Sequence, residues 1–359
     1  MSALVPIKNY SGPAKAAVTF NAALSPMMAE GENGAIKLAF DYKRTMRSTG
    51  SEGYLLSTLD DAQAKINLTP FDSWTLLPTL FPSYLGVTTA VGSGYAAGAL
   101  KIGSRPHDIY AGAANGCGLT QVWTIDGRMY NLVRTAITKH PTLKLGVGMP
   151  LFSDIEISAL ADPALALGAG GELIDTAAHV AGVAGTTGVV ESAATDPASW
   201  TPDFINGHWT GVYGTSAGFG GDGNLPMDAE DGWELVPAIK YSPLLMQKRT
   251  YHMKLDSVMF AVKARIQSPT HTALMALAGS YALGAGIMGG TLASPTKTSL
   301  VLTGPLGKTI TLPDCVPIFD NSGFEFGGTK LNTGEVLFVT RAIPTGNPAV
   351  PPVLLSFSA

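Results

Sequence analysis

Apolar and polar side chains alternate along several stretches of this chain, and a period of two residues is typical of β-strands with one buried face. In residues 36–42 the even-numbered positions are apolar and the odd-numbered positions are charged or small. In residues 154–159 the even-numbered positions carry Asp154, Glu156 and Ser158, and the odd-numbered ones carry Ile155, Ile157 and Ala159. We expect this second strand to bury its isoleucines and to turn an acidic face toward water.

Two longer segments predict a hairpin and a bent strand. Residues 119–133 form two strand-like runs around Asp126-Gly127, a dipeptide that suits the left-handed angles of a tight hairpin turn. In residues 247–266 the apolar positions change from odd-numbered to even-numbered beyond Leu255, and this change of face requires a bulge or a turn near Asp256-Ser257. Further strands are predicted at 334–343 and 352–358.

These patterns predict a mainly β (α+β) fold: β-sandwich or barrel-forming sheets with a flanking short helix, in a single domain over 1–359. A Gly- and Ala-rich insertion or elaboration is predicted at about 161–232. The apolar stretch 271–293 carries no charged residue and is long enough to span a bilayer, but its glycines weaken a helix. We expect a short buried helix at about 269–278, started by Ser268-Pro269, and no membrane insertion.

The composition adds a prediction about assembly. Charged residues make up 14% of the chain, against about 25% in ordinary soluble domains, so we expect other copies of the chain to cover much of its surface. The formal net charge is −4 and no Lys/Arg-rich run exists, which argues against tight phosphate binding. The start of the chain does not resemble a signal peptide, and we expect Cys117 and Cys315 to be free thiols in a cytoplasm.

Several motifs that carry chemistry elsewhere are present without the context they need. Ser216 lies in a G-x-S-x-G pattern, but the glycines and Pro that follow do not favour the helix of a nucleophile elbow. Asp154 and Glu156 would place two carboxylates roughly 7 Å apart, but no aromatic cluster for a sugar lies beside them. The acidic run 228–234 lacks the ligand spacing of a calcium loop, and 168–173 lacks the third glycine of a dinucleotide site. The histidines also lack metal-ligand spacing; they are His107, His140, His179, His208, His252 and His271. We therefore predict no catalytic residue, no metal and no cofactor.

The order of three segments resembles tail tube proteins of long flexible-tailed (siphovirus-type) bacteriophages. Residues 126–160 contain a hairpin, a Pro-containing turn, a Gly-containing link that ends in Pro-Leu-Phe, and an alternating strand. Residues 196–214 contain an acidic and aromatic loop that leads into a Trp-containing strand, and residues 231–270 match the downstream strands. Together these segments cover about a quarter of the chain; the first hundred residues carry no such match.

The resemblance implies that the protein is a virion component and not an enzyme. Such proteins form homohexameric rings that stack into a tube, with an inner barrel completed across subunits, and other tail proteins bind at the tube ends. Assembly takes place in the host cytoplasm, and the genome passes through the tube without specific binding.

On that basis Asp154 and Glu156 are candidate lumen-facing residues, with an outer, solvent-facing strand face as the alternative. The stretch 41–54 is a candidate inter-ring contact loop, with an ordinary exposed hairpin tip as the alternative; its charged residues are Lys43, Arg44, Arg47 and Glu52. Three other functions stay open: a capsid or capsid-decoration protein, a serine hydrolase that uses Ser216, and a membrane-inserted protein that uses 271–293.

Overall fold

The computed structural model describes residues 14–19, 25–28, 36–49, 53–70, 72–81, 100–103, 109–110, 118–124, 128–149, 151–161, 175–178, 206–214, 227–246, 249–267, 282–284, 287–288, 298–319, 324–325, 332–341 and 353–358. Within them the fold is mainly β, as the alternation predicts. Helical structure in this part of the chain is limited to the single turn α1 (Leu77–Leu80) and the 3-10 turns η1 (Trp74–Leu76) and η8 (Pro305–Gly307). The predicted helix at 269–278 lies outside the described residues.

Antiparallel pairing builds one layer of the molecule around β8 (Arg128–Lys139), and we name it the β8 layer. Its strand order is β3 (Lys37–Thr49), β4 (Gly53–Leu68), β10 (Ile155–Ala159), β8, β7 (Gly118–Thr124), β1 (Ala14–Thr19) and β2 (Ser25–Met28). The strand β11 (Asp175–Ala178) pairs with the first part of β8, and β10 pairs with its second part. The predicted hairpin around Asp126-Gly127 is confirmed, since β7 pairs with β8 across that dipeptide.

A second layer forms around β15 (Arg249–Gln267), and we name it the β15 layer. One row of strands is β9 (Leu143–Leu145), β14 (Trp233–Met246), β15, β22 (Asn332–Thr340) and β20 (Cys315–Phe319), with β21 (Phe324–Glu325) also on β22. A second row of strands begins with β13 (Met227–Ala229), which pairs with the end of β15. It continues in order with β12 (Thr210–Tyr213), β18 (Leu300–Thr303), β19 (Thr309–Leu312), β23 (Val353–Ser358) and β5 (Leu100–Gly103). The short β6 (Ile109–Tyr110) also pairs with β15, and β16 (Ala282–Gly284) pairs with β17 (Ile287–Met288) apart from both layers. Arg249 of β15 lies beside Ala62 of β4 and joins the two layers.

The change of face predicted in β15 is confirmed. Lys240 of β14 lies opposite Ser257, but the next residue, Tyr241, lies opposite Leu255, so Asp256 is an extra residue in the ladder. Before this bulge the odd-numbered Met253 and Leu255 are buried, and after it the even-numbered side chains from Phe260 to Ile266 are buried. The bulge thus lets one 19-residue strand bury apolar side chains along both of its halves.

The apolar faces of both layers meet in one core. The β8 layer contributes Ile66, Ile137 and Ile157, and the β15 layer contributes Leu235, Val262 and Phe338, all fully buried. The segment η1–α1 fills the space between the layers: Trp74 and Phe81 contact Phe357 with ring centroids 5.7 and 5.8 Å apart. Within 161–232, where the sequence predicts an elaboration, the described residues form β11, β12 and β13 and the connections beside them.

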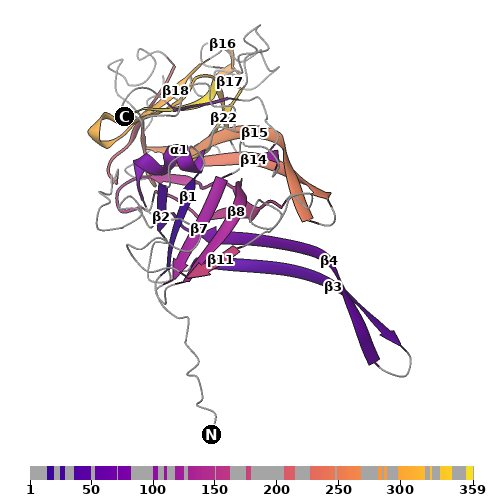
Figure 1. Ribbon diagram of the computed structural model, residues 1–359. Helices are drawn as coiled ribbons and strands as arrows, with labels where there is room; N and C mark the ends of the chain where they lie inside the picture. Colours follow the sequence, from indigo (N-terminus) through magenta and orange to yellow (C-terminus); the bar gives the residue numbers. More distant parts are fainter. Residues whose placement is uncertain are drawn as a thin grey trace.

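The hairpin of β3 and β4 extends beyond the rest of the molecule (Figure 1). From Lys43 opposite Asp61 to Thr49 opposite Gly53 the two strands pair with each other and, in the part of the chain that the structure describes, with nothing else. We call residues 43–61 the β3–β4 arm; residues 50–52 at its tip lie outside the described residues. Among the described helices none has the length and apolar character to cross a membrane.

Candidate functional site

The polar side chains of β10 share one face of the β8 layer with those of its neighbours. Residues directly opposite each other in antiparallel strands point to the same face. The registers therefore make two rows across β3, β4 and β10: Lys37, Asn67 and Glu156, and then Ala39, Lys65 and Ser158. The opposite face of β10 is the buried one, with Ile155, Ile157 and Ala159 at most 2% exposed. The strand therefore has the two faces that its alternation predicts.

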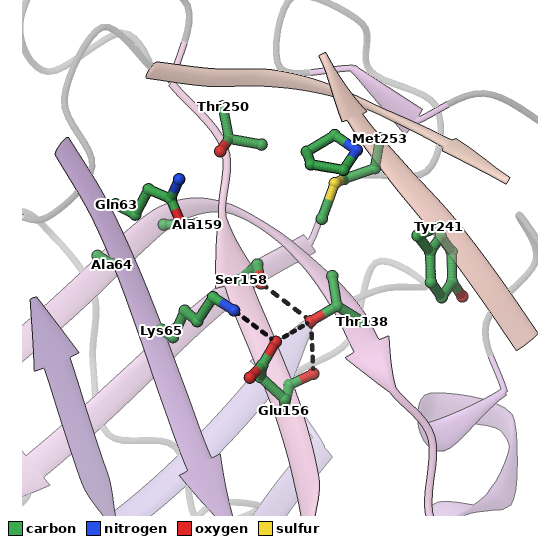
Figure 2. Close-up of a pocket in the computed structure, with 11 residues that line it drawn as sticks. Gln63, Ala64, Lys65, Thr138, Glu156, Ser158, Ala159, Tyr241, Thr250 and Met253 are labelled. Atoms are coloured by element: carbon green, nitrogen blue, oxygen red, sulfur yellow. Dashed lines mark hydrogen bonds and ion pairs between the residues drawn. The ribbon is translucent and has the colours of Figure 1, made fainter. Parts of the chain in front are cut away.

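Glu156 is held in a network of polar groups at the centre of this face (Figure 2). The Lys65 ammonium donates to Glu156 Oε1 at 3.0 Å, and the Thr138 hydroxyl donates to the same oxygen at 2.8 Å. A further hydrogen bond of 2.9 Å joins the hydroxyls of Thr138 and Ser158. Burial alone would raise the pKa of Glu156, but the hydrogen bonds from Lys65 and Thr138 and the charges of Lys65 and Lys139 outweigh it, so that the pKa is lowered. Glu156 is therefore an ionised, paired carboxylate at neutral pH.

The face is charge-balanced, although the sequence of β10 alone predicts an acidic one. By register and by contact its charged residues are three lysines and three carboxylates, so the sum is zero: Lys37, Lys65, Lys139, Asp41, Asp154 and Glu156. Lysines from the neighbouring strands compensate the acids of β10. A neutral polar face offers a passing phosphate backbone neither strong attraction nor strong repulsion.

One end of this face is covered and the other is open. At the covered end a pocket of about 250 Å³ lies between Lys65 and Glu156 on one side and Tyr241 and Met253 of the β14–β15 hairpin on the other. Ser158 at this end is only 4% exposed. At the open end Asp154 is exposed and accepts a hydrogen bond from the Thr69 hydroxyl. Of the two predicted lumen residues, Asp154 thus faces open space and Glu156 forms part of a pocket wall.

His140 is a buried connection between the layers, whereas its place before Pro141 suggests only a turn. Its Nδ1 lies 2.8 Å from the carbonyl oxygen of Leu80, and its Nε2 is hydrogen-bonded to the Tyr241 hydroxyl. Since a carbonyl oxygen only accepts, Nδ1 carries the proton and Nε2 accepts from Tyr241. The ring also stacks on Phe81 at 5.5 Å between centroids. Burial lowers the pKa of His140 to about 4 despite the opposing effect of the Leu80 hydrogen bond, so the imidazole is neutral at pH 7.

A second buried polar cluster lies beside Cys315, where sequence patterns give no signal. Asp314 is 2% exposed and accepts two hydrogen bonds of 3.1 Å from the Arg341 guanidinium. Burial, together with the charge of Asp314, raises the pKa of the Cys315 thiol to about 12, and burial likewise raises the pKa of Tyr213 to about 12. Cys315 is a free cysteine, but a buried and protonated thiol is a poor nucleophile. This cluster contributes to stability and not to covalent chemistry.

The predicted inter-ring residues lie on the β3–β4 arm. Lys43, Arg44 and Arg47 belong to β3, where the register sets Lys43 opposite Asp61 and Arg47 opposite Leu56. Glu52 lies outside the described residues. Within the stretch 41–54, residues 41–49 belong to β3 and residues 53–54 to β4, so its described part is strand and not loop.

The remaining candidates do not come together in the described part of the chain. Ser216, Cys117 and residues 168–173 lie outside it, as do three of the histidines: His107, His179 and His271. His208 is exposed and pairs with Asp228 at 3.0 Å, and the described residues contain no group of three potential metal ligands. His252 is half-buried, with its Nε2 atom shielded from solvent.

In the described part of the chain, the polar face of β10 consists of side chains that pair with one another. Glu156, the strongest candidate by position, is neutralised by Lys65 and has its pKa lowered, which is unsuited to a general acid at neutral pH. No protein-family model matches the chain, and no curated protein is significantly similar to it.

Proposed function

We propose that this protein is a structural virion protein whose copies assemble into stacked hexameric rings and form the tail tube of a long-tailed bacteriophage. The observation that carries the proposal is the outer edge of β3: 13 residues long, it pairs with β4 alone among the described residues. The resemblance of the sequence to tail tube proteins gives this edge a natural partner, which is a strand of the next copy in the ring.

A long free edge exposes a row of backbone N–H and C=O groups that readily pair with another chain. Monomeric proteins shorten, cover or bulge such edges, and barrels remove them by closure. In β3 the register shifts twice, near Arg44 and near Ser48, but the segment from Lys37 to Lys43 pairs with β4 without interruption. Phe40 within this segment is 46% exposed. Pairing in a ring would satisfy the backbone groups and cover Phe40.

The charge balance of the polar face fits a conduit. If this face lines the lumen, each copy contributes three lysines and three carboxylates to it, with Lys65 and Glu156 paired in the pocket wall at the covered end. Every phosphate that a cation binds must be released before the genome can move, so a lining with excess positive charge would slow transit. A net charge of zero avoids this cost.

A second surface also favours self-association. The side of the β15 layer that faces away from the core has one apolar row across β14, β15, β22 and β20, next to the exposed ion pair of Lys263 and Glu335. The registers align Val236, Ala261, Val339 and Val316 in one row. Next to this row, Met259 is 42% exposed and Ile318 is 39% exposed. Uncovered apolar area on several adjacent strands is typical of an interaction surface.

Electron microscopy and sedimentation of the purified protein test the proposal. We expect six-fold rings or tubes, with the fraction of assembled protein rising with protein concentration. Closed shells or trimers would favour the capsid alternative. A monomer at every concentration, including in material released from virions, would refute a tube-forming role.

The lumen assignment has its own test in a phage that carries Asp154→Lys. This exposed change raises the charge of each copy's polar face from zero to +2, so tubes should form while infectivity falls as genome delivery slows. Asp256→Lys makes the same charge change at the bulge of β15 and serves as the control. Normal infectivity of the Asp154→Lys phage would contradict the lumen assignment.

A further inference from the structure

We propose that an acidic groove at the end of the β15 layer is the docking site for the β3–β4 arm of another copy of this chain. The inference rests on the proposed function, because it names the surfaces through which successive rings would join. The groove has a volume of about 330 Å³ and lies between Val147 and Met149 on one side and Asp228, Glu230 and Asp231 on the other.

Three loops from distant parts of the sequence are fixed together at this end. The Gly148 backbone N–H donates to Asn206 Oδ1 at 2.7 Å. The next residue, Gly207, packs on Pro305 so closely that a Cβ atom there would lie 2.5 Å from the proline ring. The loops 146–149, 206–208 and 304–308 therefore present one combined surface.

The two most exposed large apolar side chains in the described residues belong to this surface. Val147 is 76% exposed and Leu306 is 82% exposed. Leu306 also has a left-handed backbone (φ 59°, ψ 21°), which costs a non-glycine residue about 1 kcal/mol. Most of each side chain is in contact with water, whereas contact with another molecule would bury it.

Charge identifies the occupant. The groove presents three carboxylates, of which Asp228 is paired with His208 at 3.0 Å. Over residues 43–61 the arm carries three cations and three acids, so its sum is zero, but the charges are separated: Lys43, Arg44 and Arg47 all belong to the outer strand β3, whereas Asp60 and Asp61 belong to β4 at the base of the arm. The positive strand β3 is therefore the part of the arm that complements the groove. The same segment contains Met46, an adaptable apolar partner for Val147 and Leu306. The carboxylates disfavour nucleic acid as the ligand.

The arm of the same subunit cannot reach the groove, because the two lie at opposite ends of β15. The strand begins at Arg249, beside Ala62 at the base of the arm, and ends at Gln267, which lines the groove. At about 3.3 Å per residue, 19 residues span roughly 60 Å. The arm from Lys43 to Thr49 extends only roughly 20 Å beyond that base. In Figure 1 the arm leaves the molecule on the side away from β18, whose following loop contains Leu306.

Complementary surfaces at opposite ends of one chain make a head-to-tail contact. Such a contact does not close on a pair, and each added copy leaves a free arm and a free groove. This is the contact that a tube of stacked rings requires along its axis, and it complements the pairing of β3 edges within a ring.

A charge exchange tests the contact in the full-length protein. Arg47→Asp on the arm and Asp231→Arg in the groove each place like charges together, and each should raise the protein concentration needed for tube formation by roughly tenfold at low salt. The protein with both changes should assemble at a concentration close to that of the wild type. Asp256→Arg, the same change of charge on the β14–β15 hairpin, should assemble normally, and circular dichroism of the unassembled subunits checks that every variant folds.

The outcomes separate this inference from the proposed function. If the wild type forms neither rings nor tubes, the proposed function fails. If the wild type forms tubes and both single variants assemble equally well, the groove is not the docking site, and it then serves a different protein or none. If each single variant fails and the double variant is not rescued, the two surfaces do not touch, and the inference is refuted while the tube stands.

Discussion

Acidification should destabilise the fold through His140, and replacing this residue should remove that effect. The folded protein keeps the imidazole neutral down to about pH 4, because the ring is buried between Leu80 and Tyr241. In the unfolded chain the same ring protonates near pH 6.5. Between these two values the unfolded state binds more protons than the folded state, so the free energy of unfolding falls as the pH falls.

The size of the effect follows from the two pKa values. The difference between 6.5 and about 4 corresponds to about 3 kcal/mol, since one pH unit of difference is worth about 1.4 kcal/mol. This contribution is fully present above pH 6.5, declines through the window and is lost near pH 4. At pH 5 roughly 2 kcal/mol of it should already be gone.

Urea unfolding of the unassembled subunit at pH 7, 6, 5 and 4.5 measures this loss. His140→Gln is the matched variant, because its amide can donate to the Leu80 carbonyl and accept from the Tyr241 hydroxyl without titrating. Every other titrating group is common to both proteins, so the difference between their pH profiles isolates His140. We expect the wild type to lose about 2 kcal/mol more than the variant between pH 7 and pH 5. Parallel profiles would refute the inference that His140 is buried and neutral.

Three further outcomes follow from particular contacts. Gly232→Ala should lower the free energy of unfolding by about 2–3 kcal/mol, because its φ is +77° and the added Cβ atom would lie 2.5 Å from the Leu145 carbonyl oxygen. Gly148→Ala is the control: its φ is +73° but the space around it is open, so it should cost only about 1 kcal/mol. Leu306→Gly should raise the melting temperature of the unassembled subunit slightly, because glycine relieves the left-handed backbone strain at this position. It should also weaken tube formation, because it removes an exposed apolar side chain from the proposed contact. A lower melting temperature would contradict this account. Glu156→Gln should lower the free energy of unfolding at pH 7 but leave it nearly unchanged at pH 3. The lowered pKa of the Glu156 carboxyl stabilises the fold above pH 4.5, and that stabilisation is lost on acidification. Chemical denaturation at both pH values measures the difference.

The periodicity of the sequence predicted the buried faces of β10 and β15 well. The two faces of β10 and the change of face at Asp256 both follow from which side chains are apolar, and that information is local. A one-residue shift in an apolar pattern has few structural causes, and a bulge is the commonest within a continuous strand. Such features need no knowledge of which strand lies next to which.

The partners of the polar side chains could not be predicted in the same way. Lys65 and Glu156 are 91 residues apart, and His140 meets Tyr241 across 101 residues. These contacts depend on strand order and register, which the alternation of a single strand does not encode. For this reason the acidic face predicted from β10 is a charge-balanced face in the folded protein.

The lengths of the strands indicate how the molecule is completed. Strands in globular proteins average about five or six residues, but β3, β4, β14 and β15 have 13, 16, 14 and 19. The length of β15 is used within the subunit, because it buries side chains of the core on both sides of its bulge. Among the described residues, the outer halves of β3 and β4 pair only with each other, and a two-stranded ribbon is at best marginally stable in water. In the proposed tube, neighbouring copies would supply the further contacts that stabilise this arm.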